Sequence, residues 1–380
     1  MNFSQMTSKE RILAAMKGQP LDRVPVQLGI TNMFTVLQNN YTGWDIYLNQ
    51  KAPMWKLVAD TQKRFGLDGY LYIGVGAEPD PDVEYHSETV ASDSDKVIVR
   101  TTMKTPEGSL WSESTYMKNE TPTVTRGYIK DENDFKLWLK YSFRPARYQK
   151  GNLDEIRSYL GEGGVVGGSA GPVPGFHHLI FSVDGKLENI VYMYQDYPEL
   201  FEEYVEKAHK AYLSKIEQMM DMGFDYIEMS NSGMVTLSSP SLFREYCLPT
   251  LRDASKIIRQ AGQLSEVHCC GFAKDVVKAC HDETFVDSIN PLQEPPMGDC
   301  VLAEIKKLYG DTLCLKGNVG VTNPLLMGTP AEVEADVIRC MEAAKENGRF
   351  ILFSEEGIGA ETPVENVEAY VAAALRYGKY

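Results

Sequence analysis

Short apolar runs recur along the chain and alternate with longer segments whose hydrophobic residues follow the period of a helix. The short runs lie at residues 25–30, 70–75, 165–169, 224–229, 264–272, 286–290, 312–317 and 349–354. Short apolar runs that alternate with helices indicate parallel strands, and eight of them match a closed (β/α)8 TIM barrel. An open doubly wound sheet is the alternative, but no G-x-G-x-x-G follows any run. The pattern therefore predicts an α/β protein of the (β/α)8 barrel type.

Residues 79–125 depart from this alternation of strands and helices. Apolar and polar residues alternate there, as at Val97, Val99 and Tyr116, around a turn at residues 105–108. A period of two with a Pro-Glu-Gly turn is typical of antiparallel hairpins. We expect a single barrel domain over residues 1–380, with an antiparallel β-hairpin or meander insertion at residues 79–125 after the second strand.

Composition and charge narrow the class of protein. The formal charge of −15 argues against a nucleic-acid partner, which needs a basic surface. No apolar run approaches the ~20 residues that a membrane span requires. The seven cysteines have no regular spacing, which favours free or metal-bound thiols in a reducing compartment. We expect a cytoplasmic protein that acts on small molecules or binds other proteins.

The run at residues 264–272, LSEVHCCGF, carries candidate metal ligands. Residues two apart in an extended chain point the same way, so His268 and Cys270 are expected to face one ion, with Cys269 turned to the other side. A neutral imidazole and a thiolate are ligands that zinc prefers. The alternative is that these are buried residues at a strand end, because free cysteine is among the most buried residue types.

In a barrel the chemistry lies at the carboxyl ends of the strands. The polar or aromatic residues near those ends include Asn32, Tyr72, His177, Glu228, Asn231, Asn290, Asn318, Glu355 and Glu356. Of these, we expect Asn32, Tyr72, His177, Asn290 and Asn318 to line a substrate pocket. The alternative for Glu228 and Asn231 is strand-end hydrogen bonding, and for Glu355 and Glu356 it is a solvated acidic turn.

Several stretches of the sequence resemble the uroporphyrinogen decarboxylase superfamily. They are SKERILAAMKGQPLDRVPV at residues 8–26, LSSPSLFREYCLPTL at 237–251, SINPLQEPPMGD at 288–299, LKGNVGVTNPLLMGTPAEV at 315–333 and TPVENVEAYV at 362–371. The resemblance implies a (β/α)8 barrel, in agreement with the strand count. True decarboxylases of this superfamily carry an arginine-rich stretch after the first strand, where this chain reads QLGITNMF. That absence makes a porphyrinogen with many carboxylates an unsuitable substrate.

The corrinoid-dependent methyltransferases of the same superfamily are similar to this chain in the pair His268-x-Cys270. In the thiol-methylating members a cysteine after the eighth strand is the third zinc ligand, and the matching position here is about Glu356. The resemblance therefore implies a zinc site of His268, Cys270 and Glu356, with Glu228 as a second candidate ligand. In this scheme Glu356 is alternatively an acid for the leaving group, and Glu228 and Asn231 orient the substrate.

The function implied by the resemblance is transfer of a methyl group between a small methylated substrate and the cobalt of a corrinoid. The substrate is an ether, an amine or a thiol. The chain shows no Asp-x-His-x-x-Gly stretch of the corrinoid carriers, so we expect the corrinoid on a partner protein. Two alternatives remain open: a metal-independent decarboxylase or lyase of a small carboxylic acid, and a non-catalytic subunit of a methyl-transfer complex.

Overall fold

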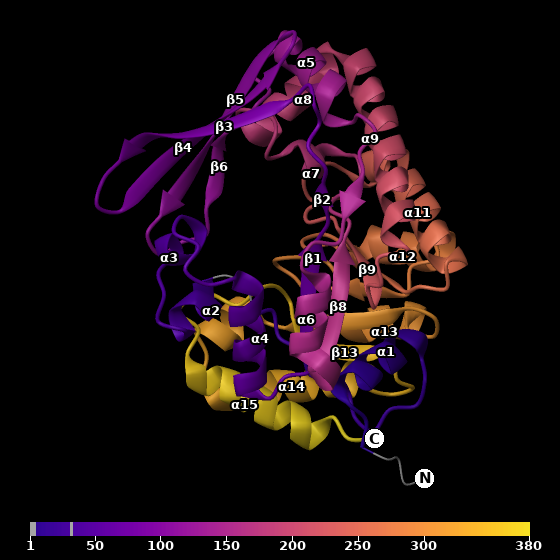
Figure 1. Cartoon of the computed structure of the whole chain (residues 1–380). Helices are drawn as coiled ribbons and strands as arrows, with labels where there is room; N and C mark the ends of the chain where they lie inside the picture. Colours follow the sequence, from indigo (N-terminus) through magenta and orange to yellow (C-terminus); the bar gives the residue numbers. More distant parts are fainter. Residues whose placement is uncertain (1–4, 31–32) are drawn as a thin grey trace.

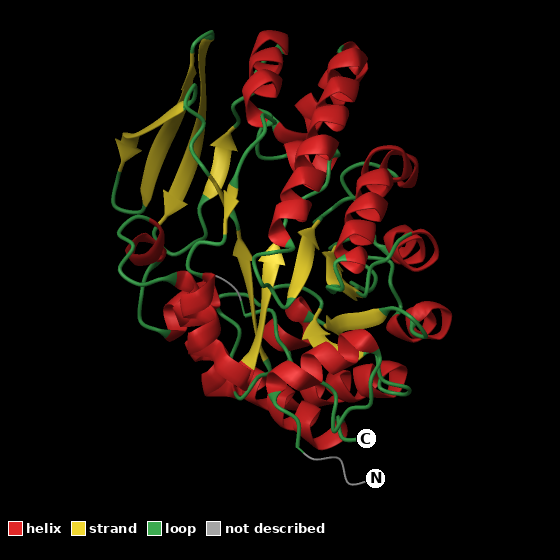
Figure 2. Ribbon diagram, turned by 45° about the vertical axis from the view of Figure 1, so that its right-hand side comes forward, coloured by secondary structure: helices red, strands yellow, loops and turns green. Residues whose placement is uncertain are grey.

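Seven parallel strands form one curled sheet in the computed structural model, which describes residues 5–30 and 33–380. Their order in the sheet is β1 (Gly69–Gly74), β8 (Gly164–Ser169), β9 (Tyr226–Ser230), β10 (Ser265–His268), β11 (Ser288–Asn290), β12 (Cys314–Val319) and β13 (Phe350–Ser354). Helices cover the outside of this sheet (Figures 1 and 2). The prediction of an α/β fold with a parallel, barrel-type sheet is confirmed, and seven of the eight predicted runs are strands.

The remaining predicted strand, residues 25–30, is wrong as a strand and is reduced to a bridge. Val26 makes a parallel bridge with Leu352 of β13, and its carbonyl accepts a hydrogen bond from the amide of Asp68 next to β1. Pro25 offers no N–H, and the amide of Ile30 bonds locally to Leu28 instead of to a neighbouring strand. The segment therefore lies between β13 and β1 without forming a regular ladder.

The helices alternate with the barrel strands as the sequence predicts. Those that follow or precede barrel strands are α1 (Ser8–Lys17), α4 (Met54–Phe65), α6 (Leu153–Leu160), α9 (Pro198–Met219), α11 (Leu248–Gln260), α12 (Lys274–Glu283), α13 (Leu302–Tyr309), α14 (Pro330–Ala344) and α15 (Val364–Tyr377). Shorter or peripheral helices are α2 (Met33–Gln38), α3 (Gly43–Tyr47), α5 (Glu132–Ser142), α7 (Phe176–Leu179), α8 (Lys186–Asp196) and α10 (Pro240–Leu242). None of the described helices combines the length and apolarity needed to cross a membrane.

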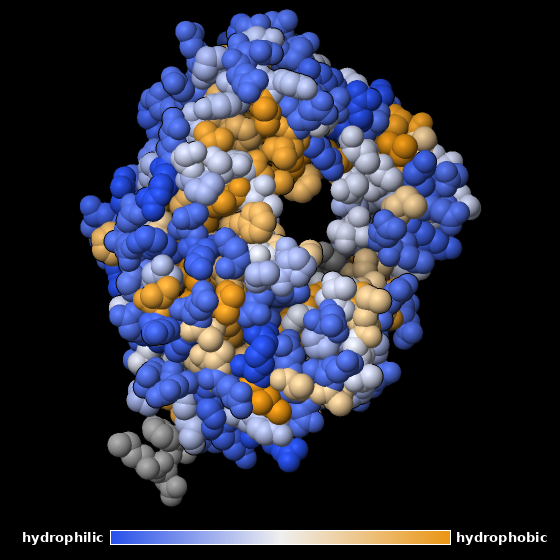
Figure 3. All heavy atoms as spheres, turned by 180° about the vertical axis from the view of Figure 1, so that it is seen from behind, coloured by the Kyte–Doolittle hydropathy of each residue, from blue (hydrophilic) through white to orange (hydrophobic). Residues whose placement is uncertain are grey.

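An antiparallel sheet stands beside the carboxyl ends of the barrel strands. Its strands are β3 (Glu84–Ser92), β4 (Lys96–Thr105), β5 (Gly108–Met117) and β6 (Thr123–Arg126), and a small ladder joins β2 (Gly76–Ala77) to β7 (Tyr148–Gln149). One end of the sheet packs Met103 and Leu110 into a core shared with α5. At the other end the indole N–H of Trp44 in α3 donates to the carbonyl of Tyr116. The sheet is therefore tied at both ends, and the space-filling view shows an opening through the molecule (Figure 3).

A buried carboxylate ties the bridge segment to the bottom of the barrel. Asp68 accepts hydrogen bonds from Arg11 at 2.7 Å, from Arg23 at 2.6 Å and from the amide of Val26 at 2.7 Å. Its side chain has no exposed surface, and that of Arg11 is 4% exposed. Removing one partner of a buried ion pair leaves an uncompensated charge, which costs far more than the pair itself contributes.

We predict that Asp68→Ala lowers the free energy of unfolding by ~3–5 kcal/mol, because it leaves Arg11 without one of its carboxylates in a buried position. The measurement is urea unfolding of the purified variant. Asp154→Ala, which removes the exposed partner of Lys150, is the control and should leave the midpoint unchanged. Equal midpoints for the two variants would show that Asp68 does not hold this end of the barrel together.

Candidate metal centre

The register of three parallel strands sets one row of polar side chains at the end of the barrel. His268 on β10 pairs with Ser230 on β9 and with Asn290 on β11. Two residues earlier in each strand, Glu266 pairs with Glu228 and with Ser288. Residues two apart in a strand share a face. His268 therefore lies directly above Glu266, and the two rows form successive layers of one wall.

His268, Cys270 and Glu356 come together at this end of the barrel. One ligand atom of each lies within 4.8 Å of the others, and all three side chains are half-buried. Cys269, between the two ligand candidates, is fully buried in the apolar core on the other side of the chain. The alternation expected from an extended stretch is thus present, and it brings an imidazole, a thiol and a carboxylate to one point.

The imidazole of His268 is held from both sides. Its Nδ1 lies 2.7 Å from Oδ1 of Asn290, and its Nε2 lies 3.1 Å from the hydroxyl of Ser232 and 4.0 Å from Oε2 of Glu356. An Asn290 acceptor fixes the proton on Nδ1 of the neutral ring, so Nε2 keeps the lone pair that a metal needs. Burial lowers the pKa of His268, but the Cys270 hydrogen bond and the charge of Glu356 outweigh it and raise this pKa to about 9. The metal-free ring is therefore protonated at neutral pH, and a metal ion bound at Nε2 would displace that proton.

Glu356 owes its position to a close approach of the bridge segment. The hydroxyl of Ser354 accepts from the amide of Gly29 and donates to the carbonyl of Glu356. A Cβ atom on Gly29 would lie 2.5 Å from that same carbonyl oxygen, so the approach requires glycine. The side chain of Glu356 is 44% exposed, whereas a carboxylate oxygen of neighbouring Glu355 accepts from the amide of Val321. Glu356 is thus the one of the two acids that points to His268.

A tyrosine lies across the barrel below the metal ligands. The hydroxyl of Tyr72 on β1 donates to Glu266 at 2.5 Å and accepts from Nζ of Lys316 on β12 at 2.9 Å. Lys316 also lies 3.3 Å from Glu266, and Ser288 donates to the other oxygen of that carboxylate. The buried charges of Lys316 and Glu266 are therefore paired and hydrogen-bonded, as burial requires. This network forms the floor beneath His268.

Glu228 is a second buried acid beside this floor. It is 2% exposed and accepts a hydrogen bond from the hydroxyl of Ser230, while its Oε2 has no hydrogen-bond partner among the described residues. Burial raises the pKa of Glu228 against the opposing charge of His268. A raised pKa favours the uncharged form of this acid.

Three other predicted pocket residues have partners within the protein. The amide of Asn231 accepts from the backbone of Val173 and from Nε2 of His177, and donates to the carbonyl of Met229. Burial lowers the pKa of His177 to about 4, so the ring is neutral. Asn318 bonds to the carbonyl of Leu292 and to Arg339. Asn231, His177 and Asn318 thus support the loops around the site, while predicted Asn32 lies outside the described residues.

Sequence reasoning assigned no role to Glu266, to Lys316 or to Ser232. Glu266 precedes His268 by two residues, so strand alternation alone places it on the same face. Lys316 lies within an apolar run, where an isolated charge signals a buried partner. No comparable signal exists for Ser232, because its contact with His268 depends on the path of the loop after β9.

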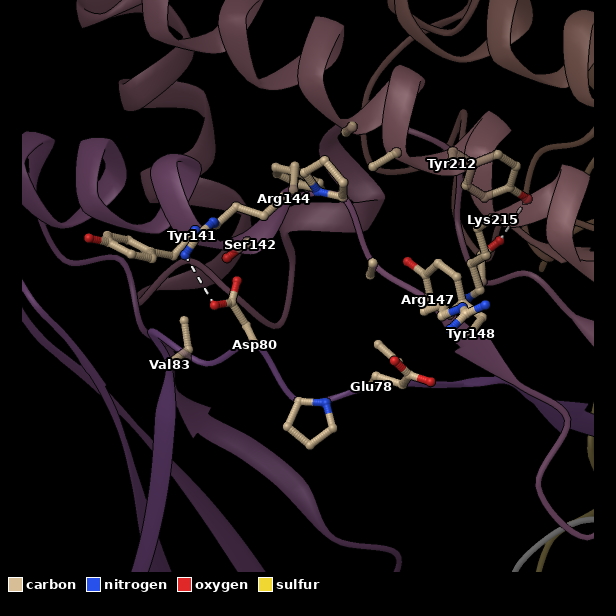
Figure 4. Close-up of a pocket in the computed structure, with 18 of the residues that line it drawn as sticks. Glu78, Asp80, Val83, Tyr141, Ser142, Arg144, Arg147, Tyr148, Tyr212 and Lys215 are labelled. Carbon is tan, nitrogen blue, oxygen red and sulfur yellow. Dashed lines mark hydrogen bonds and ion pairs between the residues drawn. The ribbon is translucent and has the colours of Figure 1, made fainter.

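A large cavity lies elsewhere. It has a volume of about 940 Å³ and is lined by the segment after β2, the loop after α5 and the outer side of α9, including Asp80, Arg144 and Lys215 (Figure 4). None of the predicted site residues lines it. Arg144 is paired there with Asp80 and Asp82, at 3.1 and 2.9 Å. This cavity is thus separate from the His268 cluster.

The donor set of the cluster fits a zinc ion. One imidazole, one thiol and one carboxylate give three protein ligands and leave a fourth position for a substrate, which is the pattern of catalytic zinc sites. Asn290 makes with His268 the kind of hydrogen bond that orients histidine ligands in zinc sites. The geometry therefore provides both the ligands and the support that such a site requires.

Comparisons with known proteins agree with this fold. Two relatives from Methanosarcina barkeri, the second from strain Fusaro / DSM 804, are named methylcobamide:CoM methyltransferase MtaA; each is 24% identical over 378 residues, 99% of both chains. A solved structure described as a methyltransferase from Methanosarcina mazei has a TM-score of 0.65 at 19% identity, over 98% of this chain and 99% of that chain, which shows a shared fold. The family described as uroporphyrinogen decarboxylase (URO-D) matches residues 91–377. Because that match covers more than half of the chain, the protein belongs to the uroporphyrinogen decarboxylase family.

Proposed function

We propose that this protein is a methyltransferase that moves a methyl group between a small substrate and the cobalt of a corrinoid carried by a partner protein. The observation that carries the proposal is the convergence of His268, Cys270 and Glu356 at the carboxyl end of the barrel. The names of the relatives, methylcobamide:CoM methyltransferase, support the same class of reaction. The open end of the barrel gives a corrinoid on another protein access to these side chains.

In this proposal His268, Cys270 and Glu356 hold a zinc ion. A zinc ion held there would act as a Lewis acid, either lowering the pKa of a bound thiol or polarising the oxygen or nitrogen that carries the methyl group. Asn290 keeps the His268 ring in place, and Ser232 contacts its other nitrogen. The oxygen of Glu228 that has no partner among the described residues would contact and orient the substrate, with the hydroxyl of Ser230 on the other oxygen.

The decarboxylase alternative has no support from the site. Removal of a carboxylate from a porphyrinogen or a small acid requires cationic groups that hold it. Residues 27–34, where true decarboxylases carry arginines, contain none. Lys316, inside the barrel, is already paired with Glu266. The methyltransferase proposal uses the groups that are present.

The first test is metal content. We predict that the wild-type protein, purified with zinc and then desalted, retains about one zinc ion per chain and that His268→Ala retains almost none, because two protein ligands bind zinc weakly. Elemental analysis by mass spectrometry gives the ratio. His281→Ala changes a histidine of α12 that bonds to Asp282 and Asp311 and should keep the metal. Equal zinc in all three proteins would refute the site.

The second test concerns the support of His268. We predict that Asn290→Ala weakens zinc binding by ~10–100-fold, the usual effect of losing the hydrogen bond behind a histidine ligand. Competition with a chromophoric chelator measures the affinity. Asn189→Ala removes an amide that bonds to the carbonyl of Asp184 far from the site, and its affinity should match the wild type. An unchanged affinity for Asn290→Ala would mean that this contact does not orient a ligand.

The third test is methyl transfer itself. The cobalt spectrum is followed with cob(I)alamin and methanol, methylamines or aryl methyl ethers as donors, and with methylcob(III)alamin and thiols as acceptors. We predict turnover with at least one of these, and a loss of kcat/KM of roughly 100-fold in Glu356→Gln, because Lewis-acid stabilisation is worth several kcal/mol. Glu355→Gln is the matched control. Zinc-loaded protein that is inactive with every compound would contradict the proposed function.

A further inference from the structure

The loops around the open end of the barrel contain no lysine or arginine. Each segment runs from the end of a strand to the helix or sheet strand that carries the next cation: residues 75–95, which include β2 and β3, residues 170–185, which include α7, and residues 231–239, 269–273, 291–301, 320–329 and 355–363. Asp80 and Glu294 in these segments are paired with Arg144 and Arg339, whereas Glu355 and Glu361 make no ion pair among the described residues. The segments that directly follow the strands thus carry unpaired acids and no lysine or arginine.

The two cationic side chains inside the barrel are already engaged. Lys316 is 1% exposed, donates to Tyr72 and Glu266, and lies against aromatic rings, 4.5 Å from the ring centre of Tyr70 and 4.7 Å from that of Phe353. His268 belongs to the ligand cluster. Neither can serve as a counter-ion for an acidic group of a substrate.

The nearest cations outside the barrel loops are also matched by acids or lie in other cavities. Lys118, at the tip of the antiparallel sheet, lines a cavity with Asp95, Glu120 and Glu361. Arg144 is paired with two aspartates in the separate cavity of Figure 4, which Lys215 also lines. Lys215 donates to the carbonyl of Ala170. Lys118 and Lys215 make no ion pair among the described residues, but both lie outside the segments that directly follow the barrel strands, and those segments offer an anionic substrate group no cationic partner.

The floor below the ligand cluster offers an anionic group no free hydrogen-bond donor. Tyr72 reaches from β1 across to Glu266, two residues before His268, and the residue remains 36% exposed. Its hydroxyl already donates to Glu266 and accepts from Lys316. Lys316 also lies 5.4 Å from its ring centre, and the rings of Tyr70 and Tyr226 pack edge-on against it. The exposed part of the ring tolerates uncharged methyl and methylene groups.

We propose that the small substrate of this site carries no anionic group: it is an uncharged or cationic compound, with the Tyr72 ring beneath it. The inference rests on the proposed function and names the substrate class of the same site. A sulfonate, carboxylate or phosphate placed there would lose water without gaining a cationic partner, and carboxylates would repel it.

Three thiols of similar size test this inference: 2-mercaptoethanesulfonate, 2-mercaptoethanol and 2-aminoethanethiol. Each accepts the methyl group of methylcob(III)alamin. The thiolate sulfur supplies the electron pair of the new S–C bond, cobalt keeps the pair of the broken Co–C bond as cob(I)alamin, and the thiol proton goes to solvent. Rates with zinc-loaded protein are divided by the uncatalysed rate of each thiol, which removes differences in thiol acidity.

We expect kcat/KM for the sulfonate to be at least ~10-fold below that for 2-mercaptoethanol. The value for 2-aminoethanethiol should equal or exceed that for 2-mercaptoethanol. Added salt should reduce the differences among the three thiols because salt screens charge. Glu361→Lys places a cation in the loop after β13 and should raise the relative rate of the sulfonate. Glu365→Lys, an exposed site on α15, is the matched control. A sulfonate that is the best acceptor overturns the inference and leaves the proposed function intact.

A second readout does not depend on turnover. In protein loaded with cobalt(II) in place of zinc, thiolate binding produces a charge-transfer absorption that gives a dissociation constant for each thiol. The same order is expected, with the sulfonate weakest. Tightest binding of the sulfonate contradicts the inference alone. Failure of all three thiols to bind or react contradicts both the inference and a thiol-accepting site.

Discussion

The parallel register of β9, β10 and β11 is the constraint on which the metal centre depends. It aligns Ser230, His268 and Asn290 in one row and Glu228, Glu266 and Ser288 in the row below. A slip of one residue in β10 would turn His268 into the helix layer and bring Cys269 to the barrel interior. The short apolar runs before and within these strands prevent that slip, because Val267 and Ile289 are fully buried on the opposite face.

The ion pair below the metal ligands explains the electrostatic character of the site. Burying Lys316 and Glu266 costs several kcal/mol for each charge unless their hydrogen bonds are made. Tyr72 and Ser288 make those bonds, and the rings of Tyr70 and Phe353 face the ammonium group. The ammonium group of Lys316 is thus fully engaged by Glu266 and Tyr72. Lys316 is therefore not free to bind an anionic group of a substrate.

Much of this arrangement follows from sequence alone. Alternation within residues 264–272 predicted His268 and Cys270 together and Cys269 apart. The barrel prediction gave Glu356 only as one of many strand-end residues, and the resemblance to the corrinoid-dependent methyltransferases singled it out. Strand alternation also predicts that Glu266 lies on the same face as His268. Nothing in the sequence indicates that the hydroxyl of Tyr72 crosses the barrel to bond to Glu266. Residues 25–30 have a strand pattern yet form one bridge, because Pro25 and a local bond at Ile30 remove ladder partners. The inward orientation of Asn231 and Asn318 was equally hidden, since it depends on loops that fold back over their amides.

The carboxylate at the third ligand position and the acidic mouth bear on different steps of the proposed reaction. If Glu356 holds a zinc ion, as we propose, it would keep the charge that the cysteine of the thiol-methylating members brings to the ligand set. It would also replace a sulfur donor with a harder oxygen donor, and zinc held in this way would be a stronger Lewis acid. The loops without lysine or arginine act on substrate entry, before any bond changes. Glu356 is the second residue after β13, whereas the loops without lysine or arginine follow all the barrel strands. A substitution at position 356 therefore does not require substitutions in the other loops. Glu356 and the loops without lysine or arginine nevertheless both favour a substrate whose reacting atom is uncharged before it meets a metal ion. This agreement is the physical reason for proposing a substrate other than an anionic thiol.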